Sequence, residues 1–298
     1  MRCLNISNHP LIVITFDFPI WIKAVRIVLE KNLPVLVRLG GFHLLKSYLG
    51  SIEYIMRDSG LEDCFNEIYK SSIPNIICGN AYYKCLRAHF LIDSALTTFI
   101  LESVITEEDV VYIETYLTNI SEDFLGSDEA TERLTNISKK VDEKFTILSS
   151  SGRTSKLWAG YHKIICYLKN FIRSERLHDL SLHLSTVGSM LPIFAASGHG
   201  SYAKGSRLYL QLMQDFQKKH KSVYEMFEVF GYHTVRYNNK KWCGVWTDLS
   251  IEQSLMRGCK SIGGLTHGRN RNKKSAHKVW CSTLHHFTDI SQTLSPKK

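Results

Sequence analysis

The sequence lacks any long apolar run. No stretch of its 298 residues approaches the roughly 20 apolar residues that a bilayer-spanning helix needs. The short apolar run Leu11–Phe16 ends at Asp17, which is too soon for the core of a secretory signal. We therefore expect an intracellular protein with no membrane partner.

The spacing of cysteine and histidine lacks the common metal and redox motifs. The chain has 8 cysteines and 13 histidines, yet it holds no Cys-x-x-Cys and no His-Glu-x-x-His segment. A chain of this length that is 44% hydrophobic can bury a core without disulfides. We expect reduced, buried thiols and no small-molecule cofactor.

Acidic residues are nearly absent from the C-terminal segment. Residues 253–298 hold nine basic residues against the single acid Asp289, a net charge of +8. Residues 101–150 hold twelve acids and four bases, a net charge of −8. The overall charge of +9 therefore hides an acidic middle and a basic end.

The N-terminal part predicts an α/β unit. Leu11–Phe16 and Val35–Leu39 are rich in β-branched residues and predict strands, with helices expected over Ile20–Asn32 and Phe42–Ser59. Pro19 is expected to prevent continuation of the first strand. Strand, helix, strand and helix in this order are typical of an α/β segment, which we assign to residues 1–78.

The rest of the chain predicts a helical body followed by a hairpin. Residues 79–230 have helical periodicity almost throughout, with a break expected at Ser149–Gly152. In residues 231–298, Tyr232–Tyr237 and Trp242–Thr247 predict a β-hairpin. A helix should follow over Asp248–Cys259, with Asp248 or Ser250 as its N-cap and Glu252 in its first turn, and a final helix over Ala276–Phe287.

Three side chains are candidates for chemistry. Asp17 follows a strand, where ligand and metal groups gather in α/β sheets; His43 begins a helix after Gly40-Gly41; Glu252 lies near a helix start. Taken singly, each is better explained by an ordinary role. Asp17 would be an N-cap or turn acid, His43 a half-buried ring bonded to a backbone carbonyl, and Glu252 a favourable first-turn acid.

A basic segment is the candidate nucleic-acid contact. Lysine and arginine spaced by glycine and asparagine can follow a phosphate backbone with salt-dependent affinity. The candidate residues are Arg257, Lys260, Arg269, Arg271, Lys273 and Lys274. A solvated tail or a nuclear-import signal explains the same pattern equally well. We expect an intracellular protein with a nuclear location.

Taken in order, three segments resemble the core of RNase H-like DNA transposases of the hAT type. They are VITFDFPIWIKA (13–24), GGFH (40–43) and LSIEQSLMRGCKSIGGLTHGRN (249–270). The phrases LGGFH and GGLT-x-GR are also similar to a set of uncharacterised, transposon-like invertebrate proteins. The resemblance implies that Asp17 is the second catalytic acid and Glu252 the last, with His43 beside them. It also implies that Asp17 and Glu252 would hold Mg2+ if the ancestral site is retained.

The chain departs from that pattern in two places. The first catalytic aspartate of the group would lie upstream of residue 1, and Gly40 stands where a Cys-x-x-His-type motif has cysteine. We therefore expect a truncated relic: an α+β, predominantly α-helical fold whose partial RNase H-like core is interrupted by a large helical insertion. If active, it would be a metal-dependent transposase or nuclease.

The expected function is that of a catalytically incompetent transposase remnant that binds the phosphate backbone of DNA. One alternative is a non-enzymatic helical module for protein contacts or self-association, in which the acidic and basic segments pair. A degenerate reading frame is the third interpretation.

Overall fold

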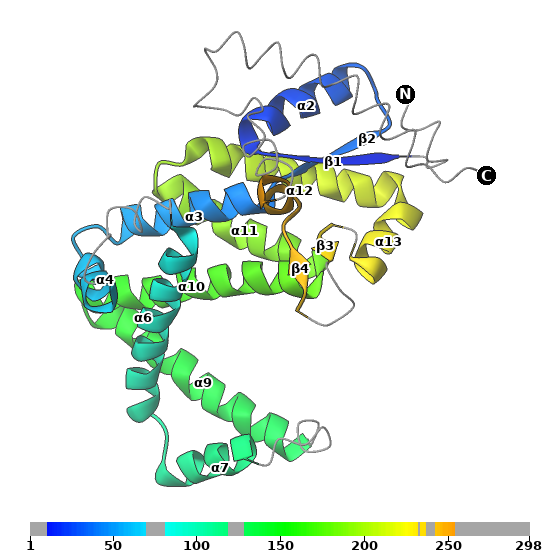
Figure 1. The fold of residues 1–298 in the computed structure, drawn as a ribbon. Helices are drawn as coiled ribbons and strands as arrows, with labels where there is room; N and C mark the ends of the chain where they lie inside the picture. Colours follow the sequence, from blue (N-terminus) through cyan, green and yellow to red (C-terminus); the bar gives the residue numbers. More distant parts are fainter. Residues whose placement is uncertain (1–10, 70–80, 119–127, 232, 237–241, 254–298) are drawn as a thin grey trace. The chain divides into compact units, whose positions relative to one another are not determined.

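The computed structural model describes residues 11–69, 81–118, 128–231, 233–236 and 242–253 (Figure 1). The chain divides into two compact units. The first comprises the described residues of Met1–His43, Glu175–His178 and Glu225–Lys298. The second comprises those of Leu44–Ser174 and Asp179–Tyr224. The first unit thus combines segments from both halves of the chain.

The first unit contains the expected α/β segment. Strand β1 (Ile12–Phe16) pairs in parallel with β2 (Val35–Leu39), with Ile12 opposite Val35 and Phe16 opposite Leu39. Helix α2 (Phe18–Glu30) connects the strands and packs against both, and Figure 1 shows it in blue beside them. The fully buried Trp21 ties helix to sheet, because its Nε1–H donates to the Val37 carbonyl at 3.1 Å.

Helix α2 begins two residues earlier than predicted. Pro19 lies in its first turn and does not merely end the strand. Proline suits this position because its fixed φ is helical and its missing N–H would have no partner there. Strand β1 is only partly buried, with Val13 38% exposed.

A short hairpin completes the described part of the first unit. Strands β3 (Val235–Arg236) and β4 (Gly244–Val245) pair antiparallel, and helix α14 (Thr247–Ile251) follows. Both strands are shorter than predicted. The N-cap of α14 is Trp246, so the prediction of Asp248 or Ser250 as N-cap is wrong. The predicted continuation to Cys259 and the predicted helix Ala276–Phe287 lie outside the described residues.

Helices build the second unit. Helix α3 (Gly41–Ile55) begins in the first unit and continues into the second, and helix α13 (Lys221–Phe230) runs from the second into the first. The others are α4 (Leu61–Tyr69), α6 (Tyr82–Glu102), α7 (Glu107–Thr118), α9 (Asp128–Ser151), α10 (Arg153–Leu177), α11 (Leu180–Ala196) and α12 (Gly200–Lys219). The break predicted at Ser149–Gly152 is narrower in the structure, because α9 runs to Ser151 and α10 starts at Arg153.

Aromatic side chains join these helices. The Tyr48 ring of α3 meets Phe194 of α11 edge to face, with centroids 5.6 Å apart. Its hydroxyl donates to the Ile164 carbonyl of α10 at 3.2 Å, so the buried polar tip is satisfied. Helices α11 and α12 pack along each other (Figure 1). The rings of His183 and Tyr209 are in contact across them.

The predicted α+β, predominantly α-helical fold class is confirmed. The sheets within the described residues have two strands each. The predicted segments 1–78, 79–230 and 231–298 differ from the two compact units, since the second unit starts at Leu44. None of the described helices is long and apolar enough to cross a membrane.

Candidate functional site

The carboxylate of Asp248 lies at the N-terminus of α3. The Phe42 N–H donates to Asp248 Oδ1 and the His43 N–H to Oδ2, each at 3.1 Å. The first N–H groups of a helix have no partner within it, and the helix dipole favours negative charge there. The buried Asp248 side chain therefore caps α3, although it lies about 200 residues further along the chain.

The glycine pair makes this close approach possible. A Cβ at Gly40 would lie 2.5 Å from Asp248 Oδ2, and one at Gly41 would lie 2.4 Å from Trp246 Cδ1. Distances this short are repulsive, so any larger residue would displace the segment that carries Asp248. The Gly40-Gly41 pair is thus explained by packing at the start of α3.

The His43 ring bridges two carboxylates. Its Nδ1 lies 3.1 Å from Asp248 Oδ2 and its Nε2 lies 3.3 Å from Glu252 Oε1. The hydrogen bond with Asp248 raises the pKa of His43, and the charges of Asp248, Glu252 and Asp17 add to this against the opposing effect of burial. The half-buried ring therefore favours the charged imidazolium form.

Asp17 directly follows β1, the strand that pairs with β2. It stands at the N-cap of α2, but its side chain makes no capping hydrogen bond. Its charge contributes to the raised pKa of His43. The Gly40 N–H donates to the Phe16 carbonyl at 2.7 Å, which holds the C-terminal ends of β1 and β2 together. Asp17, His43, Asp248 and Glu252 form what we term the carboxylate–histidine cluster.

The donor set of this cluster does not fit two Mg2+ ions. Both oxygens of Asp248 already face N–H donors, and Glu252 faces the His43 ring. Two-metal sites need free carboxylate oxygens around cations about 4 Å apart, whereas here the His43 ring lies between the carboxylates of Asp248 and Glu252. Among the residues that the structure describes, no group of three His, Cys, Asp or Glu side chains could hold a metal ion.

Of the three acid–base residues that the sequence singles out, His43 and Glu252 are in contact, with His43 Nε2 lying 3.3 Å from Glu252 Oε1. The charge of Asp17 contributes to the raised pKa of His43. Sequence reasoning missed the part of Asp248, which it treated as a possible cap of its own helix. The nucleic-acid candidates Arg257, Lys260, Arg269, Arg271, Lys273 and Lys274 lie outside the described residues.

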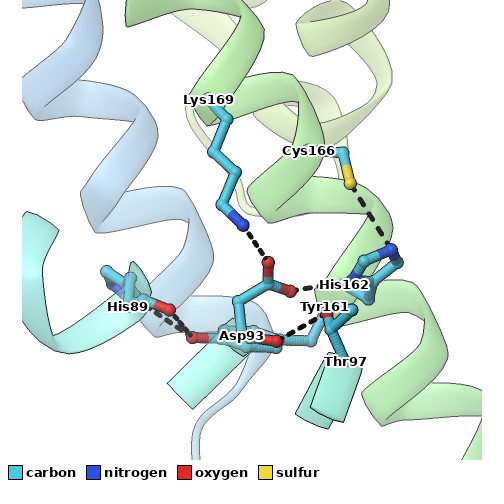
Figure 2. A network of polar contacts seen from close by, with 7 residues as sticks. All are labelled: His89, Asp93, Thr97, Tyr161, His162, Cys166 and Lys169. Carbon is cyan, nitrogen blue, oxygen red and sulfur yellow. Dashed lines mark hydrogen bonds and ion pairs between the residues drawn. The ribbon is translucent and has the colours of Figure 1, made fainter. Parts of the chain in front are cut away.

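A second polar cluster joins α6 to α10 in the second unit (Figure 2). The fully buried Asp93 of α6 pairs through Oδ1 with His162 Nδ1 at 2.8 Å and through Oδ2 with Lys169 Nζ at 2.5 Å. The other ring nitrogen of His162 lies 3.5 Å from the Cys166 sulfur. We term Asp93, His162, Cys166 and Lys169 the Asp93 network.

The pKa values of the two histidines in Figure 2 shift in opposite directions. Burial alone would lower the pKa of His162, but the hydrogen bonds with Asp93 and Cys166 outweigh it and raise the pKa to about 9. Burial lowers the pKa of His89 to about 3, and this neutral ring contacts the Tyr161 hydroxyl at 3.0 Å. Helical spacing could have shown that His162, Cys166 and Lys169 share one face of α10, but not that this face meets Asp93.

Comparisons with known proteins give a family but no described activity. The model of a family described as "Domain of unknown function (DUF8702)" matches residues 2–297. No curated protein and no solved structure gives a match to the chain.

Proposed function

The chain belongs to this family of unknown function, and from its own residues we propose that it is a remnant of an RNase H-like DNA transposase core. In this proposal the first unit descends from the catalytic core and the helical body corresponds to the insertion. The remnant binds the DNA backbone through its basic C-terminal segment and does not cut DNA.

One observation carries the proposal. Asp17 follows β1, Glu252 follows α14, and both act on His43 at the start of α3. The resemblance pairs these same positions, and short-range local structure gives no reason for them to meet. Their convergence next to two parallel strand ends supports a shared origin with strand-end catalytic sites.

The bonding of the cluster supports the loss of catalysis. A catalytic carboxylate must offer oxygens to metal or substrate, but the Asp248 oxygens cap α3 and Glu252 pairs with His43. Because the raised pKa of His43 favours its cation, the ring neutralises negative charge that metals would otherwise balance. The cluster thus acts as a structural clasp between the two strand ends and α14.

Charge supports the DNA contact. Residues 253–298 carry a net charge of +8 and follow directly from the segment that bears Glu252. Lysine and arginine that neutralise phosphates release bound counterions, so affinity falls steeply as salt rises. The expected ligand is duplex DNA of any sequence.

Fluorescence anisotropy of a labelled duplex tests this contact. We expect binding at about 50 mM salt that weakens at least tenfold by about 200 mM. The double variant Lys273→Gln/Lys274→Gln should weaken binding, whereas Lys218→Gln/Lys219→Gln, a matched pair at the exposed end of α12, should not. Absence of binding at the lower salt concentration would refute the DNA role.

A non-enzymatic interaction module is the second candidate. Large apolar side chains are exposed in the second unit, with Phe99 69%, Val111 62% and Ile147 59% exposed. Such side chains could meet another copy or another protein. Sizing chromatography at low and high salt tests self-association, and a monomer under both conditions would remove it.

A further inference from the structure

The Asp93 network holds a thiol, an imidazole and a carboxylate in series (Figure 2). Cys166 lies 3.5 Å from one nitrogen of His162, and the other nitrogen lies 2.8 Å from Asp93. This is the order of nucleophile, base and orienting acid that activates thiols in enzymes. We propose that Cys166 is a reactive thiol that undergoes thiol–disulfide exchange with small, anionic disulfides.

The geometry fixes which nitrogen of the His162 ring faces the Cys166 sulfur. Asp93 faces Nδ1 of His162, so it holds the ring with Nε2 toward the Cys166 sulfur. The ring is further held by stacking on Phe145, with centroids 3.9 Å and planes 5° apart. Because the raised pKa of His162 favours the imidazolium, the ring presents an Nε2–H to the sulfur, and this cation, held by the buried Asp93 carboxylate, stabilises the thiolate that Cys166 forms when its proton leaves.

The charges around the sulfur support the class of disulfide. Lys163 and Lys169 lie three residues before and after Cys166 on α10, so both flank it on the helix surface. Lys169 is partly committed to Asp93, while Lys163 is exposed. Tyr48 of α3 also interacts with Cys166, but burial raises the pKa of that phenol and keeps it neutral. A disulfide that carries carboxylates would thus meet a positive surface.

The exchange balances without a further reactant. The Cys166 thiolate attacks one sulfur of the disulfide, a new sulfur–sulfur bond forms and the old one breaks. The departing thiolate takes the electron pair and receives the proton held by His162. Cys166 is oxidised to a mixed disulfide, and the departing half is reduced to a thiol.

The chain offers a matched comparison in Cys243. Its sulfur also lies near a histidine, 3.7 Å from His178 Nε2, and both cysteines are partly exposed. However, Nδ1 of His178 contacts the Thr234 hydroxyl instead of a carboxylate, and burial lowers the pKa of this ring. A neutral imidazole would not hold a thiolate, so Cys243 should react more slowly than Cys166.

The test treats the folded, full-length chain with 5,5′-dithiobis(2-nitrobenzoate) and maps the modified cysteines by peptide mass spectrometry over time. An ordinary thiol is only a few per cent thiolate at pH 7, so we expect Cys166 to react about tenfold faster than Cys243. Between pH 6.5 and 8.5 the Cys166 rate should rise much less steeply with pH than the Cys243 rate.

Two variants separate activation from mere exposure. His162→Gln should slow Cys166 about tenfold and restore an ordinary pH slope, whereas His178→Gln should leave Cys166 unchanged. If His162→Gln does not fold, the pH profile of the unaltered chain decides. A Cys166 rate no greater than that of Cys243 at pH 7, or one that rises by about tenfold per pH unit, would overturn the proposal.

Discussion

Asp248 Oδ2 lies 3.1 Å from both the backbone nitrogen and the Nδ1 of His43. One carboxylate therefore fixes the start of a helix and the orientation of a ring that belongs to a distant part of the sequence. The stability of the first unit and the electrostatics of the carboxylate–histidine cluster depend on the same contact.

Loss of the Asp248 carboxylate should destabilise the protein. Asp248→Ala leaves two buried helix N–H groups without an acceptor, which we expect to cost about 2–3 kcal/mol of unfolding free energy. Urea denaturation measures it, with the exposed Asp142→Ala on α9 as a control that should stay within about 0.5 kcal/mol. Equal stability of both variants would show that Asp248 does not cap α3.

The glycine pair should not tolerate alanine. Gly41→Ala places a methyl group against Trp246, so we expect a loss of at least about 2 kcal/mol. Gly160→Ala in α10 meets nothing within 4 Å and should stabilise the chain by up to about 1 kcal/mol, because alanine favours helix. Thermal melts of both variants compare the two positions. A neutral Gly41→Ala would contradict the close approach of Trp246.

His43 should make stability pH-dependent. Its folded pKa is raised, so its contribution is full below its unfolded value near 6.5 and is lost as pH rises through the folded value. The difference in unfolding free energy between the unaltered chain and His43→Gln should therefore shrink from pH 6 to pH 8.5. A difference that grows over this range would mean that the ring is neutral in the cluster.

The ion pairs of the buried Asp93 should contribute more to the unfolding free energy than the exposed pair of Arg26 and Glu30. Asp93→Ala leaves Lys169 and His162 without their buried partner, and because the Lys169 side chain is 42% exposed and can be solvated, this should cost about 1–3 kcal/mol. Glu30→Ala removes an exposed pair with Arg26, whose side chain is 79% exposed, and should cost less than about 0.5 kcal/mol. Hydrogen exchange of α6 and α10 amides would show whether the Asp93 variant loosens these helices.

Local sequence patterns predicted much of the fold, and the errors in those predictions have physical causes. The β-branched runs gave β1 and β2 nearly to the residue, since such side chains suit a pleated sheet. The predicted start of α2 was two residues late, because a proline after a strand is compatible with the first turn of a helix as well as with a turn before it.

The candidate sites show the same limit. Asp17, His43 and Glu252 were proposed from residue type and resemblance, but the role of Asp248 was not, because the N–H groups that donate to it lie in α3 rather than in its own helix. The Asp93 network was not predicted for the same reason. Periodicity assigns Asp93 to a face of α6 and His162 to a face of α10, but only tertiary packing brings these two faces into contact.

Incubation of the full-length chain with supercoiled plasmid and Mg2+ at about 50 mM salt tests the central claim most directly, with products resolved on one gel. A DNA-binding remnant with a clasped carboxylate–histidine cluster should retard the plasmid and leave it supercoiled. Mg2+-dependent nicking that disappears in both Asp17→Asn and Glu252→Gln would contradict the account by showing a working catalytic centre. A plasmid that is neither retarded nor nicked would contradict its DNA-binding part.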